Sequence, residues 1–153
     1  MPRPPTFFLD RTFGAELLAA ELRSWGWPVE VHRKWFKQTT ADDEWITRVA
    51  EKRWKIVTAD KDLEFRYHEA IVAAKAAIFV VKELKQGEGY KKWVSMMDSC
   101  RRRIVHDALF APCPFVARIS RDGNVSRVTQ LMAHGRTKNI SQSVAVHFEM
   151  YSS

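Results

Sequence analysis

The sequence predicts a single α/β domain: a three-layer α/β/α sandwich with a central, mainly parallel sheet and a C-terminal hairpin extension. Short apolar runs at residues 6–9, 27–31, 55–58 and 77–81 are typical of buried strands, and amphipathic segments separate them. Strands that alternate with helices favour a parallel sheet covered on both faces. A chain of 153 residues is also long enough to bury the core of one domain.

Three segments of the first half show helical spacing. Residues 13–25 show spacings of three and four and are followed by Gly26, a good helix C-cap; the positions are Leu17, Leu18, Glu21, Leu22 and Trp25. Residues 42–53 place Trp45, Ile46 and Val49 on one face, which predicts a helix leading directly into the strand at 55–58. A further helix is expected within residues 62–75.

The second half predicts one long helix and a hairpin. Between residues 90 and 109, an apolar stripe contains Trp93, Met96, Met97 and Cys100; it suits the core, and the alternative is an interface with a partner or a second copy. Strands at 115–119 and 125–128 flank residues 121–124, a strong turn sequence. Residues 144–150 alternate apolar and polar side chains, which leaves an edge strand, a partner-binding segment and partial disorder open.

The charge is divided unevenly along the chain. Residues 1–65 hold 11 Lys/Arg and 11 Asp/Glu, whereas residues 66–153 hold 14 Lys/Arg and 7 Asp/Glu and therefore carry the whole net charge of +7. A basic half beside clustered acids suits a polyanion such as a nucleic acid, and the alternative is a set of solvated lysines. No Walker loop, GxGxxG or GxSxG motif is present, so no organic cofactor is expected.

The apolar content indicates no membrane segment. The longest such stretch, residues 70–81, is interrupted by Lys75 and is too short to span a bilayer, and the N-terminus lacks a signal-peptide core. We therefore expect a cytoplasmic protein with no membrane contact. The two cysteines, Cys100 and Cys113, show no zinc-site spacing, and we expect no disulfide between them.

Acidic residues follow two of the predicted strands. Asp10 ends the first strand, Asp60 and Asp62 come directly after the third, and Asp43 opens the helix between them beside Asp42. In the common strand order of doubly wound sheets, the first and third strands are neighbours, and ligands bind at the carboxyl ends of the strands. The sequence therefore predicts that Asp10 and Asp60 face each other although they are far apart along the chain.

Carboxylates that are brought together repel one another, and a hard divalent cation relieves that repulsion. Mg²⁺ or Mn²⁺ at such a site can make a water more acidic and stabilise the charge of phosphodiester hydrolysis. The alternative is that each aspartate only caps a helix, because aspartate is a preferred N-cap residue. Spacing alone leaves both interpretations open.

Four segments of the first half resemble the PIN-like nuclease domains, and in particular the small bacterial branch that includes the VapC-type toxins. They are residues 7–10, 17–29, 43–46 and 56–63. In that branch an aspartate closes the first strand, an Asp-x-x-Ile/Leu motif starts a helix, and a Val-Thr-x-Asp-x-Asp motif follows a strand. Residues 58–62, Thr-Ala-Asp-Lys-Asp, are the most specific match.

The resemblance implies a metal-dependent ribonuclease. It implies that Asp10, Asp43, Asp60 and Asp62 are the catalytic metal ligands for Mg²⁺ or Mn²⁺, with Asp42 as a substitute for Asp43. The expected role is an endoribonuclease toxin of a type II toxin–antitoxin pair, with RNA and a small antitoxin as partners and a homodimer as a possible assembly. The PIN-like domain is expected over residues 1–129, and residues 130–153 form a tail, either an edge strand or a partner-binding segment.

Five cationic residues are candidates for RNA binding: Arg11, Lys61, Arg33, Lys34 and Lys37. Residues 33–37 interleave cations with aromatic side chains in a predicted loop, a composition that can stack bases and hold phosphates; the alternative is that Trp35 and Phe36 close over the core. Arg11 departs from the family pattern, because many relatives have Glu or Asn there; it removes a possible ligand, or its fork binds a substrate phosphate.

Two rival functions remain. In the first, the chain is a catalytically weak PIN-like module that binds nucleic acid or protein, an interpretation motivated by Arg11. In the second, it is a receiver-like phosphoacceptor domain, which also gathers aspartates at strand ends. The receiver interpretation fits only in part, because the third strand is followed by Asp-Lys-Asp rather than by a lone aspartate.

Overall fold

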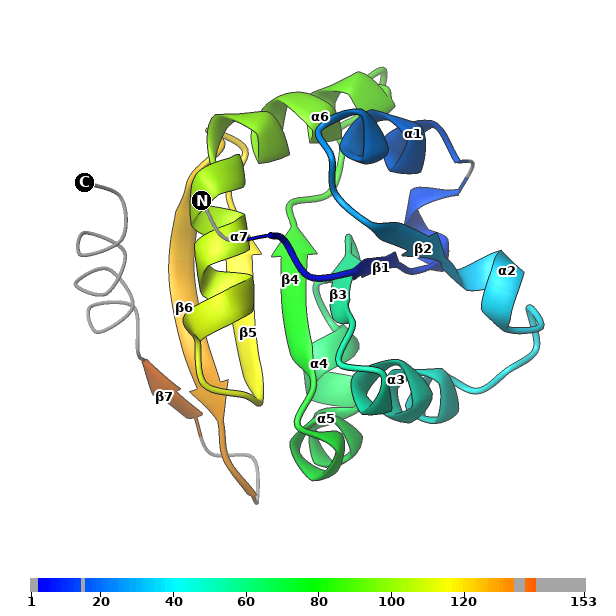
Figure 1. Ribbon diagram of the computed structural model, residues 1–153, viewed down its shortest axis with the longest axis vertical. Helices are drawn as coiled ribbons and strands as arrows, with labels where there is room; N and C mark the ends of the chain where they lie inside the picture. The colour runs from blue at the N-terminus through cyan, green and yellow to red at the C-terminus, as the bar shows by residue number, and fades with distance from the viewer. Residues whose placement is uncertain (1–2, 15, 134–136, 140–153) are drawn as a thin grey trace.

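The computed structural model describes residues 3–14, 16–133 and 137–139 (Figure 1). The strands are β1 (Phe7–Leu9), β2 (Val29–Val31), β3 (Lys55–Thr58), β4 (Ala77–Val81), β5 (Phe115–Ile119), β6 (Val125–Leu131) and β7 (Thr137–Asn139). The helices are α1 (Leu17–Ser24), α2 (His32–Trp35), α3 (Asp42–Glu51), α4 (Leu63–Arg66), α5 (His68–Ala74), α6 (Tyr90–Ser99) and α7 (Arg101–Phe110), and a 3-10 turn, η1, spans Arg11–Phe13.

The described strands form one sheet in the order β2-β1-β3-β4-β5-β6-β7. The first five strands in that order pair in parallel, and β6 and β7 add antiparallel pairs at the edge beyond β5. The predicted mainly parallel sheet with a C-terminal hairpin is therefore confirmed. The reversal of strand order places β1 beside β3, as predicted.

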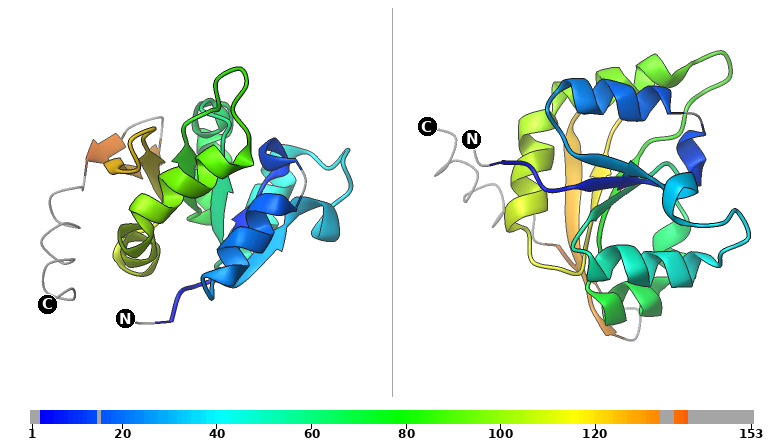
Figure 2. Two further views of the ribbon diagram at one scale, coloured as in Figure 1. Left: turned by 90° about the horizontal axis from the view of Figure 1, so that it is seen from above. Right: turned by 45° about the vertical axis from the view of Figure 1, so that its right-hand side comes forward.

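Alternation along the strands divides the core into two layers. In β1, Phe7 and Leu9 pack with α1, α6 and α7 on one face of the sheet, whereas Phe8 packs with α3, α4 and α5 on the other. Figure 2 shows this arrangement, with α1 beside α6 on one side of the strands and α3 beside α5 on the other. Because both faces are covered, β1 and β4 consist entirely of buried residues.

Several predicted helices have different bounds from those expected. The helix predicted over 62–75 is two helices separated by Tyr67, whose φ of −119° leaves the helical region. The helix predicted over 90–109 breaks at Cys100, with φ −129°. The spacing of the apolar residues does not reveal such a break, because the apolar residues of both helices face the same core. Met96, Met97 and Cys100 are buried in the core, which confirms the core interpretation of that stripe.

The expected loop at 33–37 is also partly wrong, because its first residues belong to the short helix α2. The expected domain boundary at 129/130 falls inside β6, and β7 lies within the predicted tail. Residues 134–136 and 140–153, including the segment at 144–150, lie outside the described residues. Across the part of the chain that is described, no helix has both the length and the apolar character needed to cross a bilayer.

Candidate functional site

The pairing of β1 with β3 sets the position of the first predicted acid. Leu9 is in register with Val57, so Asp10 and Thr58 follow at the same carboxyl edge of the sheet. The backbone N–H of Asp10 donates to the carbonyl of Val57 at 3.1 Å and extends the ladder by one bond. The side chain of Asp10 therefore leaves the end of β1 next to the loop that follows β3.

The Asp10 carboxylate is buried, with 7% of the residue exposed, and both of its oxygens are hydrogen-bonded. Oδ1 accepts from the backbone N–H of Thr12 at 3.0 Å and from the hydroxyl of the same residue. Oδ2 accepts from the hydroxyl of Thr58. Asp10 thus caps η1, as the capping interpretation proposed, while remaining part of the strand-end site.

The two threonines connect β1 to the loop after β3. The Thr12 hydroxyl accepts from the N–H of Ala59 at 2.9 Å, and the Thr58 hydroxyl accepts from the N–H of Asp60 at 3.0 Å. Each hydroxyl therefore donates to Asp10 and accepts from the neighbouring loop. Sequence reasoning did not identify either threonine as part of the site; the available signal was a threonine two residues from an acid in both segments.

Burial controls the charge of Asp10. The pKa of Asp10 is raised to about 6: desolvation is the main cause, the hydrogen bonds from Thr12 and Thr58 oppose it in part, and the negative charge of Asp60 adds to it. The Thr58 hydroxyl, which is bonded both to the Asp10 carboxylate and to the N–H of Asp60, shows that the two residues lie near each other, as the strand order predicted. A carboxylate held in this way is destabilised in its charged form unless a cation approaches.

Asp60 is half-buried at the same edge. Its Oδ1 accepts from the backbone N–H of Asp62 at 3.0 Å, which forms a turn leading into α4, and its Oδ2 forms an ion pair with Arg66. Asp62 itself is exposed and is the N-cap residue of α4 without a side-chain capping bond. Arg66 is a partner that the sequence did not reveal.

Asp42, rather than Asp43, is directed toward this region. The Asp42 Oδ1 accepts from Trp45 Nε1 at 2.8 Å and forms an ion pair with Arg11, which also donates to the carbonyl of Gln38. Asp43 is exposed on the first turn of α3. The N-cap of α3 is Ala41, so the interpretation of these acids as caps is wrong for this helix.

The four predicted ligands do not form a ready-made cluster. Among the described residues, no three His, Cys, Asp or Glu side chains are arranged so that they could hold a metal ion. The structure brings Asp10 and Asp60 together, places Asp42 nearby through Arg11, and leaves Asp43 and Asp62 exposed. The expected convergence of all four carboxylates is therefore reduced to a pair of strand-end acids.

A small pocket of about 140 Å³ opens beside Asp10, between η1 and the start of α2. His32 lines it and is buried, and neither of its ring nitrogens has a hydrogen-bond partner within the described chain. Its ring lies among Phe8, Phe36 and Trp45. Burial lowers the pKa of His32, and the charge of Arg11 lowers it further, so the ring is neutral at physiological pH.

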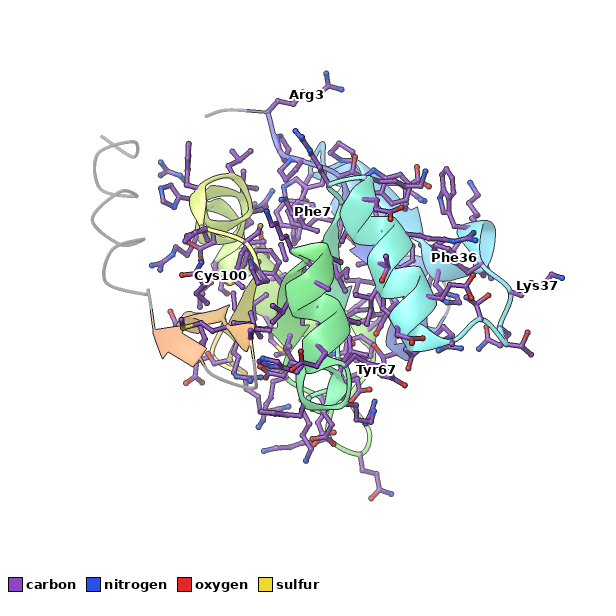
Figure 3. All side chains as sticks on the ribbon, turned by 90° about the horizontal axis from the view of Figure 1, so that it is seen from below. Arg3, Phe7, Phe36, Lys37, Tyr67 and Cys100 are labelled. Carbon is purple, nitrogen blue, oxygen red and sulfur yellow. The ribbon has the colours of Figure 1, made fainter. Side chains whose placement is uncertain are left out.

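The five predicted RNA-binding cations lie in different settings. Arg33 forms an ion pair with Glu16 at 2.8 Å, and Lys61 lies 4.0 Å from Glu83. Lys34 and Lys37 are exposed, and Figure 3 shows Lys37 pointing away from the body of the molecule.

The aromatic residues among these cations differ in burial. Phe36 is half-buried against the ring of Phe8. Trp35 is 45% exposed and donates to Glu30. The alternative in which both rings close over the core therefore applies to Phe36.

Comparison with known proteins supplies one match. A family model described as a PIN like domain matches residues 5–83, just over half of the chain. This segment begins just before β1 and ends just after β4, so it contains the strand-end acids, both threonines and Arg66. No curated protein and no solved structure matches the chain.

Proposed function

The chain belongs to the PIN-like domain family, a family of nuclease-type domains, and on that premise we propose that it is a metal-dependent endoribonuclease. The observation that carries the proposal is the Asp10–Asp60 pair, held by two threonine hydroxyls at the edge of the sheet where β1 and β3 end. Acids at this edge occupy the usual ligand-binding position of an open α/β sheet.

The residues present fit a hard divalent cation. All candidate ligands are carboxylate oxygens, which Mg²⁺ and Mn²⁺ prefer. Burial and the charge of Asp60 raise the pKa of Asp10, so a nearby cation would relieve an unfavourable carboxylate charge. Asp10 and Asp60 would hold the ion, and Asp42 would join them if Arg11 released it.

Mg²⁺ or Mn²⁺, when bound, supplies charge neutralisation at the phosphodiester and a more acidic water. The protein's own contribution is orientation. Thr12 and Thr58 fix both oxygens of Asp10, and Arg66 and the N–H of Asp62 fix those of Asp60. Lys61, between the two loop acids, is placed to attract the RNA backbone toward this edge.

The test is RNA cleavage in Mn²⁺ by the wild type and by Asp10→Asn and Asp60→Asn, with Mn²⁺ binding measured in parallel by calorimetry. We expect each variant to lower cleavage by more than about 100-fold, since even residues that only orient metal ligands cost about 10- to 100-fold. Asp98→Asn is the matched control, because Asp98 lies on α6 and pairs with Arg101, the first residue of α7. Cleavage that is absent from the wild type, or equal in all four proteins, would refute the proposal.

The second candidate function is a catalytically weak module that binds RNA or protein. Two arginines favour it, since Arg11 pairs with Asp42 and Arg66 pairs with Asp60, and each takes up a carboxylate that a cation would need. This candidate predicts RNA binding without cleavage and without measurable Mn²⁺ binding. The same calorimetry and cleavage experiments therefore separate it from the nuclease.

The biological role that we propose is the toxin of a type II toxin–antitoxin pair acting in the cytoplasm. The support is the resemblance of residues 56–63 to the VapC-type branch. Expression of the wild type should then arrest growth, expression of Asp60→Asn should not, and a small protein encoded by a neighbouring reading frame should relieve the arrest. Growth that is equal with both proteins would contradict the toxin role and leave the nuclease proposal intact.

A further inference from the structure

A second pocket lies beside the acid pair on the same edge of the sheet. It measures about 270 Å³, and its floor contains Val81 and Ile119, the last residues of β4 and β5. Lys61, from the loop that carries Asp60, forms part of its wall. The pocket and the acid pair therefore share one loop, and a chain bound in the pocket would lie next to the proposed cleavage site.

Cations outnumber acids in the lining of the pocket. Its lining contains four cations, Lys61, Lys82, Arg118 and Arg121, against a single acid, Glu83. Two of these cations, Arg118 and Arg121, belong to the segment beyond residue 83 and so lie outside the matched family segment. The lining of this pocket therefore combines residues of the matched segment with residues beyond it.

The two arginines are held in place by acids from other elements. Arg121 forms an ion pair with Glu88 at 2.6 Å, and Arg118 pairs with the buried Glu64 of α4. Such anchoring lowers the entropy cost of ordering a long side chain around a ligand. Lys82, by contrast, is exposed and makes no ion pair with the described residues, which leaves its charge available to a phosphate.

Phe65 is a neighbour of Arg118, one of the residues that line this pocket. It lies on α4, three residues after Asp62, and 68% of it is exposed, more than any other large hydrophobic side chain in the described part of the chain. The guanidinium of Arg118 lies 6.0 Å from the centroid of its ring. Leu63, at 1% exposure, supplies the contact between α4 and the core, so packing does not account for Phe65.

An exposed aromatic ring beside a cationic pocket is the arrangement by which proteins bind single strands: the cations follow the backbone and the ring stacks on a base. We propose that the β4–β5 pocket holds a backbone phosphate of single-stranded RNA while Phe65 stacks on an adjacent unpaired base. The inference rests on the proposed function, which it deepens by naming the residues that would contact the RNA backbone and an unpaired base. Bases within a duplex are already stacked on their neighbours and cannot engage Phe65 without being unpaired.

The experiment measures binding rather than cleavage. A fluorescent single-stranded RNA and a hairpin of the same composition are titrated with the full chain in EDTA, and anisotropy gives the affinities. We expect the single strand to bind about 10-fold more tightly than the hairpin, and Phe65→Ala to remove about 10-fold of its affinity. Phe65→Trp should restore binding, because the larger ring also stacks.

Leu17→Ala is the matched control, since Leu17 is the next most exposed large hydrophobic residue at 54% and lies on α1. It should leave the affinity unchanged. Equal affinity for the two RNAs, or equal binding by Phe65→Ala and wild type, would overturn the proposal. Because no metal is present, a protein that binds in this way but never cleaves would refute only the nuclease proposal.

The phosphate part of the inference has its own readout. Lys82→Gln should lower the slope of log affinity against log salt by about 0.7, the value for one contact to a single-stranded phosphate. Lys75→Gln removes the same charge from the end of α5, near the start of β4 and therefore at the other end of this strand from the pocket. It should leave the slope unchanged. Equal slopes for Lys82→Gln and wild type would show that the pocket holds no phosphate.

Discussion

The aspartates at the strand ends differ in burial and in hydrogen bonding from those at the helix starts, although both sets were predicted to belong to one site. At the strand ends, Asp10 is buried and Asp60 half-buried, and threonine hydroxyls or backbone N–H groups fix their oxygens. At the helix starts, Asp43 and Asp62 are exposed to solvent. A metal site needs ligands that are already oriented and partly desolvated. The strand-end acids meet this requirement, whereas Asp43 and Asp62 do not.

Among changes that leave every carboxylate in place, the largest effect is expected from removing the support of the strand-end acids. Thr58→Val keeps the volume of a fully buried side chain but removes the hydroxyl that donates to Asp10 and accepts from Asp60. We expect RNA cleavage to fall by about 10- to 100-fold, as for other residues that orient metal ligands. In the wild type, the hydrogen bond from Thr58 lowers the pKa of Asp10. Its loss should raise that pKa and, with it, the pH at which cleavage reaches half its maximum.

The control for this prediction belongs to the helix starts. Thr47→Val removes a hydroxyl of α3 that donates to the backbone carbonyl of Asp43. Cleavage and its pH profile should both stay at wild-type values. A comparable loss of cleavage in the two variants would mean that the strand-end and helix-start regions contribute alike, and the contrast between them would have to be abandoned.

The sequence predicted the fold because the alternation of apolar strands and amphipathic helices is a property of residue spacing. It also located Asp10 and Asp60 correctly at neighbouring strand ends, since the common strand order places β1 beside β3. It did not distinguish Asp42 from Asp43. A shift of one residue turns a helical side chain by about 100°, and the start of a helix is not defined that closely by sequence.

The arginine partners were hidden for a different reason. Arg66 reaches Asp60 because α4 begins directly after the loop that carries Asp60, and Arg11 reaches Asp42 across an interval of 31 residues. Neither pairing follows from local spacing. Thr58 was visible as part of the Val-Thr-x-Asp-x-Asp motif, but a threonine in a strand is ordinary, and only the tertiary structure shows its hydroxyl between two acids.

A smaller effect is expected in the stability of the protein. Burial raises the pKa of Asp10 from 3.8 to about 6, so the folded state binds a proton more tightly than the unfolded state. The stabilisation that this raised pKa provides is complete at pH values below the pKa of Asp10 in the unfolded state. It is lost as the pH rises through the pKa of Asp10 in the folded state. Between about pH 5 and about pH 7, this group should cost the wild type about 1 kcal/mol of unfolding free energy.

Asp10→Asn cannot ionise and should lack that loss. Urea unfolding at the two pH values should therefore show the stability of the variant rising relative to the wild type as the pH increases. Asp43→Asn, a change of the same type at a helix start, should follow the wild type across this range. A difference between Asp10→Asn and wild type that does not depend on pH would show that the buried carboxylate does not titrate in this range.

The smallest effect concerns Arg11, which links the two sets of acids. Its ion pair with Asp42 is partly exposed, with 30% and 19% of the two side chains accessible, so Arg11→Gln should change the unfolding free energy by less than about 1 kcal/mol. If the arginine competes with a cation for Asp42, the variant should bind Mn²⁺ up to about fivefold more tightly and cleave faster. If it instead holds a substrate phosphate, RNA affinity should fall while Mn²⁺ affinity stays the same. Calorimetry with Mn²⁺ and anisotropy with RNA in EDTA distinguish the two results. Tighter Mn²⁺ binding would mean that Asp42 acts as a metal ligand together with Asp10 and Asp60.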